Sequence, residues 1–230
     1  MIEKEVKNSV VAWGIICSTL FLFASLYGWR LFITPDTAPH ITDDMVWVSR
    51  FMIWFSLLIT FLYTYFIEKQ KFILWEENKY SFGIHLAMFV ILMCALLVLY
   101  IFMGITLRLM HLYEASDKMK QMVGIFREHR FLMVFTTITA GIMEELFFRA
   151  YLMPRFQLLL KNTLVTILLS AALFALIHIG YGTFANVIVP FGVGILFALF
   201  YYKFRNIKVL IITHFLWDLI LILLALRFHK

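Results

Sequence analysis

The stretch FGIHLAMFVILMCALLVLYIFMGITL, residues 82–107, decides the fold class of this chain. It contains no Asp, Glu, Lys or Arg, and as an α-helix at 1.5 Å per residue it would extend for about 39 Å. The hydrocarbon core of a bilayer is about 30 Å thick, so the run is long enough to cross it. We therefore predict a transmembrane helix here.

Similar apolar runs recur along the whole chain. Of the 230 residues, 63% are hydrophobic and 15% are charged, which leaves too little polar surface for a water-soluble fold. The short alternating segments of a membrane barrel are not seen in the sequence. We expect an all-α polytopic transmembrane bundle of about seven spans, a single integral membrane domain over 1–230 whose motif-bearing core is about 131–226. With 82–107, the expected spans are 10–33, 46–67, 131–153, 163–179, 184–202 and 207–226.

The first run, which starts near Val10, is longer than a signal-peptide core and lacks an A-x-A cleavage site, so we interpret it as a span. The segment 108–130, RLMHLYEASDKMKQMVGIFREHR, is too polar to cross a bilayer. Its apolar residues fall mostly at helical spacing, which favours an interfacial amphipathic helix, with a solvated connector as the alternative.

The net charge of +6 would suggest nucleic-acid binding in a soluble protein. Here the basic residues lie mostly in short loops, where they orient a membrane protein and meet anionic lipid, so we expect the lipid bilayer as a partner and no nucleic acid. An orientation with the N-terminus inside places more Lys and Arg residues on the inner side than on the outer side, as membrane proteins prefer, although the basic 108–130 segment opposes this orientation. The cations that this orientation places inside are Lys4, Lys7, Lys69, Lys71, Lys79, Arg149, Arg155, Lys161, Lys203, Arg205 and Lys208.

Four charged residues lie in the stretch TAGIMEELFFRAYLMPRF, residues 139–156, and three of them, Glu144, Glu145 and Arg149, fall inside the predicted span 131–153. A charge at a helix centre costs about 2.5–3.5 kcal/mol on insertion, so these side chains must pair, line a wet cavity or lie near the interface. Glu145 and Arg149 are four residues apart and can form an ion pair on one helix face. Glu144 is rotated by about 100° from Glu145 in a regular helix, so the two carboxylates should not aim at one point.

Two further patterns share this four-residue step. FALIH places Phe174 and His178 on one helix face, and HFLWD does the same for His214 and Asp218. Taken singly, each pattern has a plainer explanation as a core histidine, a structural hydrogen bond or, for the glutamates, an interfacial charge cluster. Ionisable groups on three different spans of one membrane bundle instead favour a functional site.

The expected depths of Glu144 and His214 in the membrane agree with a shared site. Glu144 should lie about 20 Å into its span, and His214 about 10–12 Å from the inner end of its own. His178 would lie about 22 Å from Thr163, which fits less well. A later start to that span, near Leu168, would bring His178 closer to the depth of the other two residues.

These three patterns resemble the Glu-Glu-x-x-x-Arg, Phe-x-x-x-His and His-x-x-x-(Asn/Asp) motifs of the CPBP intramembrane proteases. This is the CAAX protease and bacteriocin-processing (Abi-type) family, which is related to the type II CAAX prenyl endopeptidases. The resemblance covers about 139–220, and the first 130 residues add only a multi-span context. One departure is Ala150, where the family's motif usually has glycine.

The resemblance implies an endopeptidase that hydrolyses a peptide bond near the inner membrane face. Glu144 would be the general base and His178 its partner in activating water, while His214 and the residue at 218 would stabilise the oxyanion. An ionised Asp218 cannot donate to an oxyanion, so we expect it to accept from His214 and hold that imidazole as the donor.

The remaining motif residues, Glu145, Arg149 and Phe174, would have supporting roles. The resemblance implies a glutamate-type mechanism without a cofactor. A three-ligand zinc site of Glu144, His178 and His214 is the alternative, although the chain lacks a His-Glu-x-x-His motif.

The expected substrate is a peptide or membrane protein, which could carry a lipid modification, and the expected location is a bacterial cell membrane. Two other functions remain open. One is a non-catalytic immunity or scaffold protein that keeps the motifs for structure. The other is a proton-coupled transporter, although no inverted repeat supports it.

Overall fold

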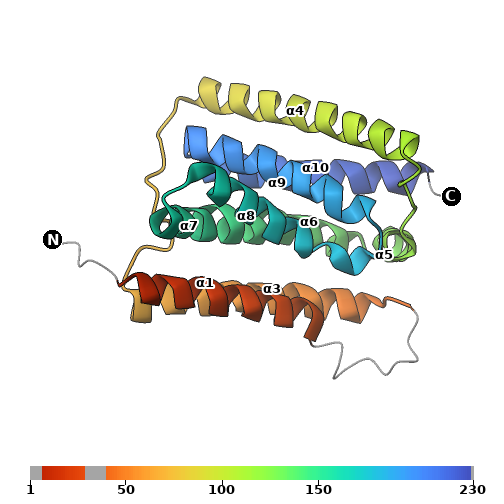
Figure 1. The fold of residues 1–230 in the computed structure, drawn as a ribbon. Helices are drawn as coiled ribbons and strands as arrows, with labels where there is room; N and C mark the ends of the chain where they lie inside the picture. Colours follow the sequence, from red (N-terminus) through yellow and green to blue (C-terminus); the bar gives the residue numbers. More distant parts are fainter. Residues whose placement is uncertain (1–6, 29–39, 229–230) are drawn as a thin grey trace.

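A computed structural model describes residues 7–28 and 40–228, and throughout these ranges the regular structure is helical, with no strands (Figure 1). Within the same ranges, seven helices are long and apolar enough to cross a membrane. The prediction of an all-α polytopic bundle is confirmed. The seven candidate spans are Asn8–Gly28, Asp43–Glu68, Phe82–Leu109, Arg130–Leu160, Thr163–Tyr181, Ala185–Phe204 and Ile207–Phe228.

The first three spans agree with the prediction except at their ends. The first comprises α1 (Asn8–Phe23) and a π-helical turn, and the predicted part beyond residue 28 lies outside the described residues. The second comprises α3 (Asp43–Tyr63) and the π-helical η2 (Thr64–Glu68). It starts earlier than predicted because the Thr42 side chain accepts from the Met45 N–H and caps the helix. The third is α4 (Phe82–Leu109).

The fourth span runs through α6 (Arg130–Glu144), the π-helical η3 (Glu145–Leu152) and α7 (Met153–Leu160). It is longer than the predicted 131–153. Arg149 and Arg155 lie inside it with no exposed surface, so counting them among the cations of the inner loops was wrong.

The last three spans are α8 (Thr163–Leu176), α9 (Ala185–Phe204) and α10 (Ile207–Phe228). Helix α8 begins at Thr163, the predicted start of this span, because the Asn162 side chain accepts from the Val165 N–H and caps the helix there; the alternative of a later start near Leu168 was wrong. After His178 the chain forms a short 3-10 turn and then Gly182 at φ +81°, which ends the span as the HIGYG sequence indicates.

The segment 108–130 contains the predicted amphipathic helix in a shorter form, α5 (Asp117–Glu128). Its apolar residues Met122 and Phe126 are buried, while its other face is exposed. The helix lies across the ends of the spans and is viewed end-on in Figure 1. Lys118 Nζ donates to the Gly180 carbonyl at 2.7 Å, which ties α5 to the turn after His178.

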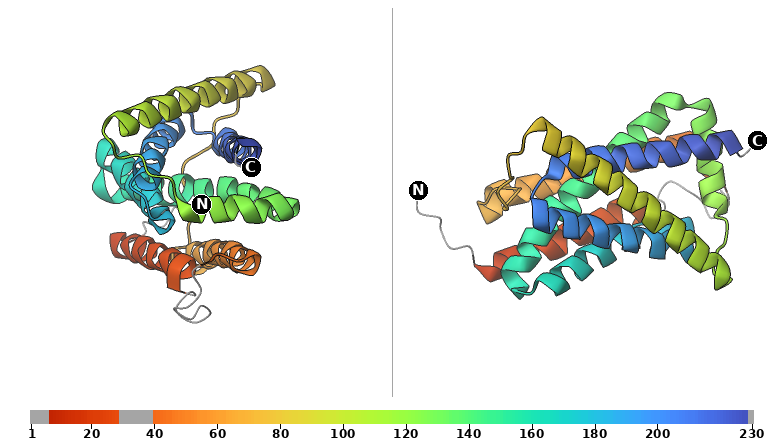
Figure 2. Two further views of the ribbon diagram at one scale, coloured as in Figure 1. Left: turned by 90° about the vertical axis from the view of Figure 1, so that its right-hand side faces the viewer. Right: turned by 90° about the horizontal axis from the view of Figure 1, so that it is seen from above.

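The motif-bearing helices occupy the middle of the bundle. In Figures 1 and 2, α1 and α3 lie side by side along one side of α6–α10, and α4 covers the opposite side. Helix α8 packs along α9, and α6 packs along α10. The second contact is close because Gly141 of α6 lies against α10: a Cβ added there would be 2.9 Å from the Ile211 carbonyl oxygen. This close approach brings the glutamates of α6 and η3 to His214 of α10.

Candidate active site

The two glutamates lie where the fourth span changes from α-helix to π-helix. Glu144 ends α6 and Glu145 begins η3, whose hydrogen bonds span five residues instead of four. Glu145 Oε1 is 2.7 Å from His214 Nδ1, and Glu144 Oε2 is 3.9 Å from His214 Nε2. Both carboxylates therefore reach one imidazole from two sides, which differs from the expectation based on a regular helix.

The predicted ion pair between Glu145 and Arg149 is confirmed. Arg149 Nη1 is 2.9 Å from Glu145 Oε1, and neither side chain has exposed surface. The guanidinium carbon also lies 4.3 Å from the centre of the Phe174 ring and 5.4 Å from that of Phe197. A carboxylate and two aromatic faces thus compensate the buried cation.

His214 is held on both ring nitrogens. Its Nδ1–H donates to Glu145, while its Nε2 is 3.5 Å from Asp218 Oδ2 and faces Glu144. The expected contact with Asp218 is present, but the shorter contact is with Glu145. Spacing in the sequence could not reveal this partner, because 69 residues separate Glu145 from His214.

His178 lies at the end of α8 and is only partly exposed. Its Nδ1 is 2.9 Å from the Phe174 carbonyl oxygen, so Nδ1–H donates there and Nε2 keeps its lone pair. The Phe174 ring contacts both imidazoles, with centroids 5.1 Å from His178 and 5.9 Å from His214. In the part of the chain that the structure describes, no direct hydrogen bond joins His178 to Glu144.

Glu144 also lines a cavity of about 20 Å³. This is room for about one water molecule. The opposite wall consists of apolar side chains of the first two spans, among them Leu22, Ile53 and Leu57. Glu144 Oε2 is buried and has no hydrogen-bond partner. The first two spans, which carry no motif, thus complete the wall around the carboxylate.

Arg50 of α3 is a charged residue that the sequence motifs did not reveal. It lies one turn before Ile53 of the cavity wall, is half-buried, and is close enough to Glu144 and Tyr181 for electrostatic interaction. Its Nε donates to Ser49 Oγ at 3.3 Å, and it has no ion pair within residues 7–28 and 40–228. A cation inside the predicted span 46–67 was the signal that could have identified it.

Comparison with known proteins agrees with these motifs. Residues 127–220 match the family model described as type II CAAX prenyl endopeptidase Rce1-like. This segment is similar to the Rce1-like family. The family resemblance inferred from the motifs is thereby confirmed for α6–α10, although the match covers less than half of the chain. No curated protein and no solved structure gives a significant match.

The Rce1-like match supports CAAX-type protease activity in general, with a peptide substrate and a membrane environment. Together with the seven apolar helices, it describes an integral multi-pass membrane protein. Across the described ranges, no group of three or more His, Cys, Asp or Glu side chains is arranged to hold a metal ion. The alternative of a three-ligand zinc site at Glu144, His178 and His214 stays a prediction, which a chelation experiment can test.

Proposed function

We propose that the protein is an intramembrane endopeptidase in which Glu144 activates water for peptide-bond hydrolysis. One observation carries the proposal: a buried Glu144 oxygen without a hydrogen-bond partner, on a carboxylate that lines a cavity the size of one water molecule. A general base must lie within hydrogen-bond reach of the proton that it removes, and water in this cavity meets that condition.

In the proposed reaction, Glu144 takes a proton from the water while the water oxygen bonds to the carbonyl carbon of the substrate. His178 keeps a lone pair on Nε2, because its Nδ1–H already donates to Phe174, and in our proposal this lone pair accepts from the water once the water moves from the cavity, which His178 does not line, toward the substrate. Collapse of the tetrahedral intermediate breaks the C–N bond, and the proton on Glu144 passes to the leaving amine.

The oxyanion of this intermediate needs a donor. We assign that role to His214, with Nδ1–H donating to Glu145 and Nε2–H to the oxyanion. Both nitrogens carry protons only in the imidazolium form, which the carboxylates of Glu145 and Asp218 favour from the two sides of the ring. Glu145 and Asp218 thus act as positioning residues, and neither has to donate a proton.

We place cleavage near the inner membrane face on the basis of the position of His214. It lies seven residues after Ile207, about 10 Å along α10 from the end of the bundle where Lys69, Lys161 and Lys208 lie. Cations favour the inner side of a membrane, so this end is the inner one in our proposal. We infer a peptide or small membrane-protein substrate in a bacterial cell membrane, and a lipid anchor on the substrate would bring its cleavage site to this depth.

The test compares the peptides released in membranes that contain the parent protein and the Glu144→Gln variant. The amide keeps the shape of the side chain but is not a base, so we expect cleavage to fall by about 10²–10⁴-fold. Glu76→Gln, on an exposed loop, is the matched control and should cleave like the parent. Parental cleavage by Glu144→Gln would refute the assignment.

Two further measurements separate the alternatives. Parental activity after dialysis against a zinc chelator supports the metal-free mechanism, whereas loss that zinc restores supports the three-ligand site. If the Glu144→Gln variant keeps the biological effect of the parent and no released peptide is found with either protein, the scaffold function replaces the protease.

A further inference from the structure

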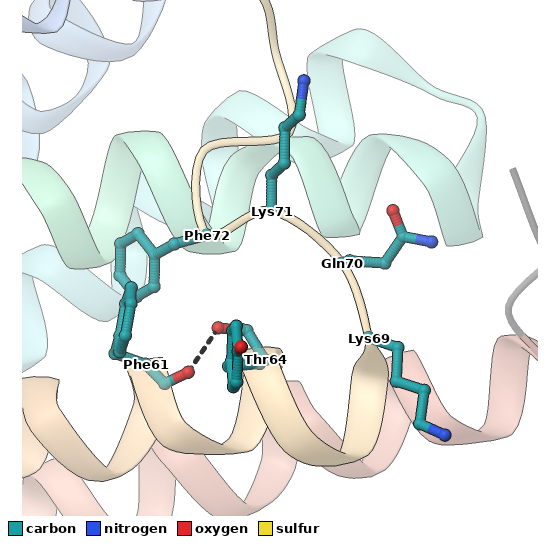
Figure 3. Close-up of a pocket in the computed structure, with 7 residues that line it drawn as sticks. Phe61, Thr64, Lys69, Gln70, Lys71 and Phe72 are labelled. Carbon is teal, nitrogen blue, oxygen red and sulfur yellow. Dashed lines mark hydrogen bonds between the residues drawn. The ribbon is translucent and has the colours of Figure 1, made fainter. Parts of the chain in front are cut away.

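A second hollow lies outside the candidate active site, where the second span ends. It has a volume of about 520 Å³, within the size range of small-molecule sites. Figure 3 shows the loop from Lys69 to Phe72 arching beside the helical turn that carries Phe61 and Thr64, with Lys69, Gln70 and Lys71 projecting from the loop. Tyr65 completes the lining. Aromatic side chains thus line the hollow from both the helix and the loop, and the loop adds the polar side chains of its rim.

Arg155 of α7 holds this loop in place through two of its backbone carbonyl groups. Its Nη1 donates to the Phe72 carbonyl at 3.0 Å, and its Nη2 donates to the Lys71 carbonyl at 3.2 Å. The same guanidinium binds both carboxylate oxygens of Glu68, the last residue of η2. Lys69 then has a left-handed backbone at φ +54°, a conformation that non-glycine residues rarely adopt. The rim of the hollow is therefore held in one arrangement before any ligand binds.

The charge of this rim is positive and uncompensated. The acidic residue that precedes Lys69, Glu68, is buried and forms an ion pair with Arg155, so those two charges cancel. Lys69 and Lys71 are exposed, and neither has an ion pair in the part of the chain that is described. Figure 3 shows Lys69 and Lys71 pointing in opposite directions on either side of Gln70, so both ammonium groups reach one anion when their exposed side chains rotate toward it.

The neighbouring apolar surface indicates where the anion comes from. Phe61 and Tyr65 line the hollow and are 48% and 64% exposed, on a helix apolar enough to cross the membrane. An occupant that contacts both the lysines and these rings must be charged at one end and apolar at the other. A phospholipid at the end of the span has this chemistry, because its phosphate lies at the membrane surface and its acyl chains lie beside the helix.

We propose that this hollow binds the phosphate headgroup of an anionic phospholipid from the inner leaflet. The phosphate oxygens contact Lys69 and Lys71, the amide of Gln70 donates to the headgroup, and the start of an acyl chain lies along Phe61 and Tyr65. Arg155 keeps the loop in place without contacting the lipid. The site is separate from the peptide-cleaving groups, so lipid binding does not depend on the proposed protease activity.

The test measures lipid binding to the full chain in detergent by native mass spectrometry, with phosphatidylglycerol and phosphatidylcholine as probes. We expect the parent to retain phosphatidylglycerol in preference to phosphatidylcholine. Each lysine near an anionic surface contributes a factor of about five, so Lys69→Gln with Lys71→Gln should weaken phosphatidylglycerol binding by about thirtyfold. The charge-preserving pair Lys69→Arg with Lys71→Arg should bind like the parent.

The matched control is Lys161→Gln with Lys208→Gln, which removes two exposed cations at the same end of the bundle but outside the hollow. This control should retain phosphatidylglycerol, and so should Glu144→Gln, whatever the outcome for cleavage. The proposal is overturned if the control loses as much binding as the rim variant, or if phosphatidylcholine binds equally well. Displacement of the lipid by an equal concentration of inorganic phosphate would also overturn it, since the site would then recognise a free anion.

Discussion

Replacing Gly141 by alanine should push α10 away from α6 and slow catalysis. The added Cβ would lie 2.9 Å from the Ile211 carbonyl oxygen and 3.0 Å from the Phe215 backbone nitrogen, both on α10. Ordinary contacts of this kind begin at 3.4 Å, so α10 must move by about 0.5 Å. Backbone atoms cannot rotate out of the way as a flexible side chain can.

This displacement reaches the candidate active site directly, because α10 carries His214 between the two glutamates. A misplacement of about 1 Å can lower a rate by about a hundredfold, so a shift of half that size should lower kcat by about tenfold. The assay is the rate of cleavage of a peptide identified by the membrane comparison above, measured on purified protein in detergent.

The matched control is Gly104→Ala, in the last two turns of α4, where an added Cβ meets nothing within 4 Å. It should leave kcat unchanged and should not destabilise the helix, because alanine favours helix more than glycine. A Gly141→Ala variant that keeps kcat within twofold of the parent would refute the reasoning, as would an equal loss in Gly104→Ala.

Three other substitutions test separate parts of the structure. Glu145→Gln should lower kcat by about tenfold or more with little change in KM, because the contact of Glu145 with the His214 imidazolium becomes weaker. It also leaves the buried Arg149 without its carboxylate, so the rate is measured on the fraction that remains folded, and an equal loss of substrate binding would contradict this role. Arg155→Met leaves Glu68 buried without its cation, and the free energy of unfolding should fall by about 3–5 kcal/mol, measured by denaturation in mild detergent. An unchanged midpoint would show that the pair does not stabilise the fold. Arg50→Gln should lower kcat by about fivefold, roughly 1 kcal/mol, because Arg50 is a half-buried cation one turn from the cavity wall and stabilises the negative charge that develops in the transition state. Arg50→Lys should recover most of that loss, and failure to do so would indicate a role in shape instead of charge.

The number and order of the spans could be predicted from the sequence, because the thickness of the bilayer sets the length of each apolar run. The ends were less predictable, since they depend on single capping side chains such as Thr42 and Asn162. The ion pair between Glu145 and Arg149 was predictable for a local reason, the four-residue step on one helix.

Contacts between distant helices could not be read from spacing. The contact between Glu145 and His214 depends on the close packing of α6 against α10 and on the change to π-helix at Glu145. The wall of the cavity beside Glu144 consists partly of Leu22 and Ile53, which look like ordinary lipid-facing residues in the sequence. Only the folded arrangement distinguishes them from their neighbours.

The ring of Phe174 has a consequence for how the three motifs can vary. It lies under the guanidinium of Arg149 and beside the imidazoles of His178 and His214, so a single side chain contacts one member of each motif. Residues that share a packing partner do not contribute independently to free energy. Changes in the three motifs should therefore be tolerated in combinations and not one at a time, and a smaller residue at position 174 would loosen all three at once.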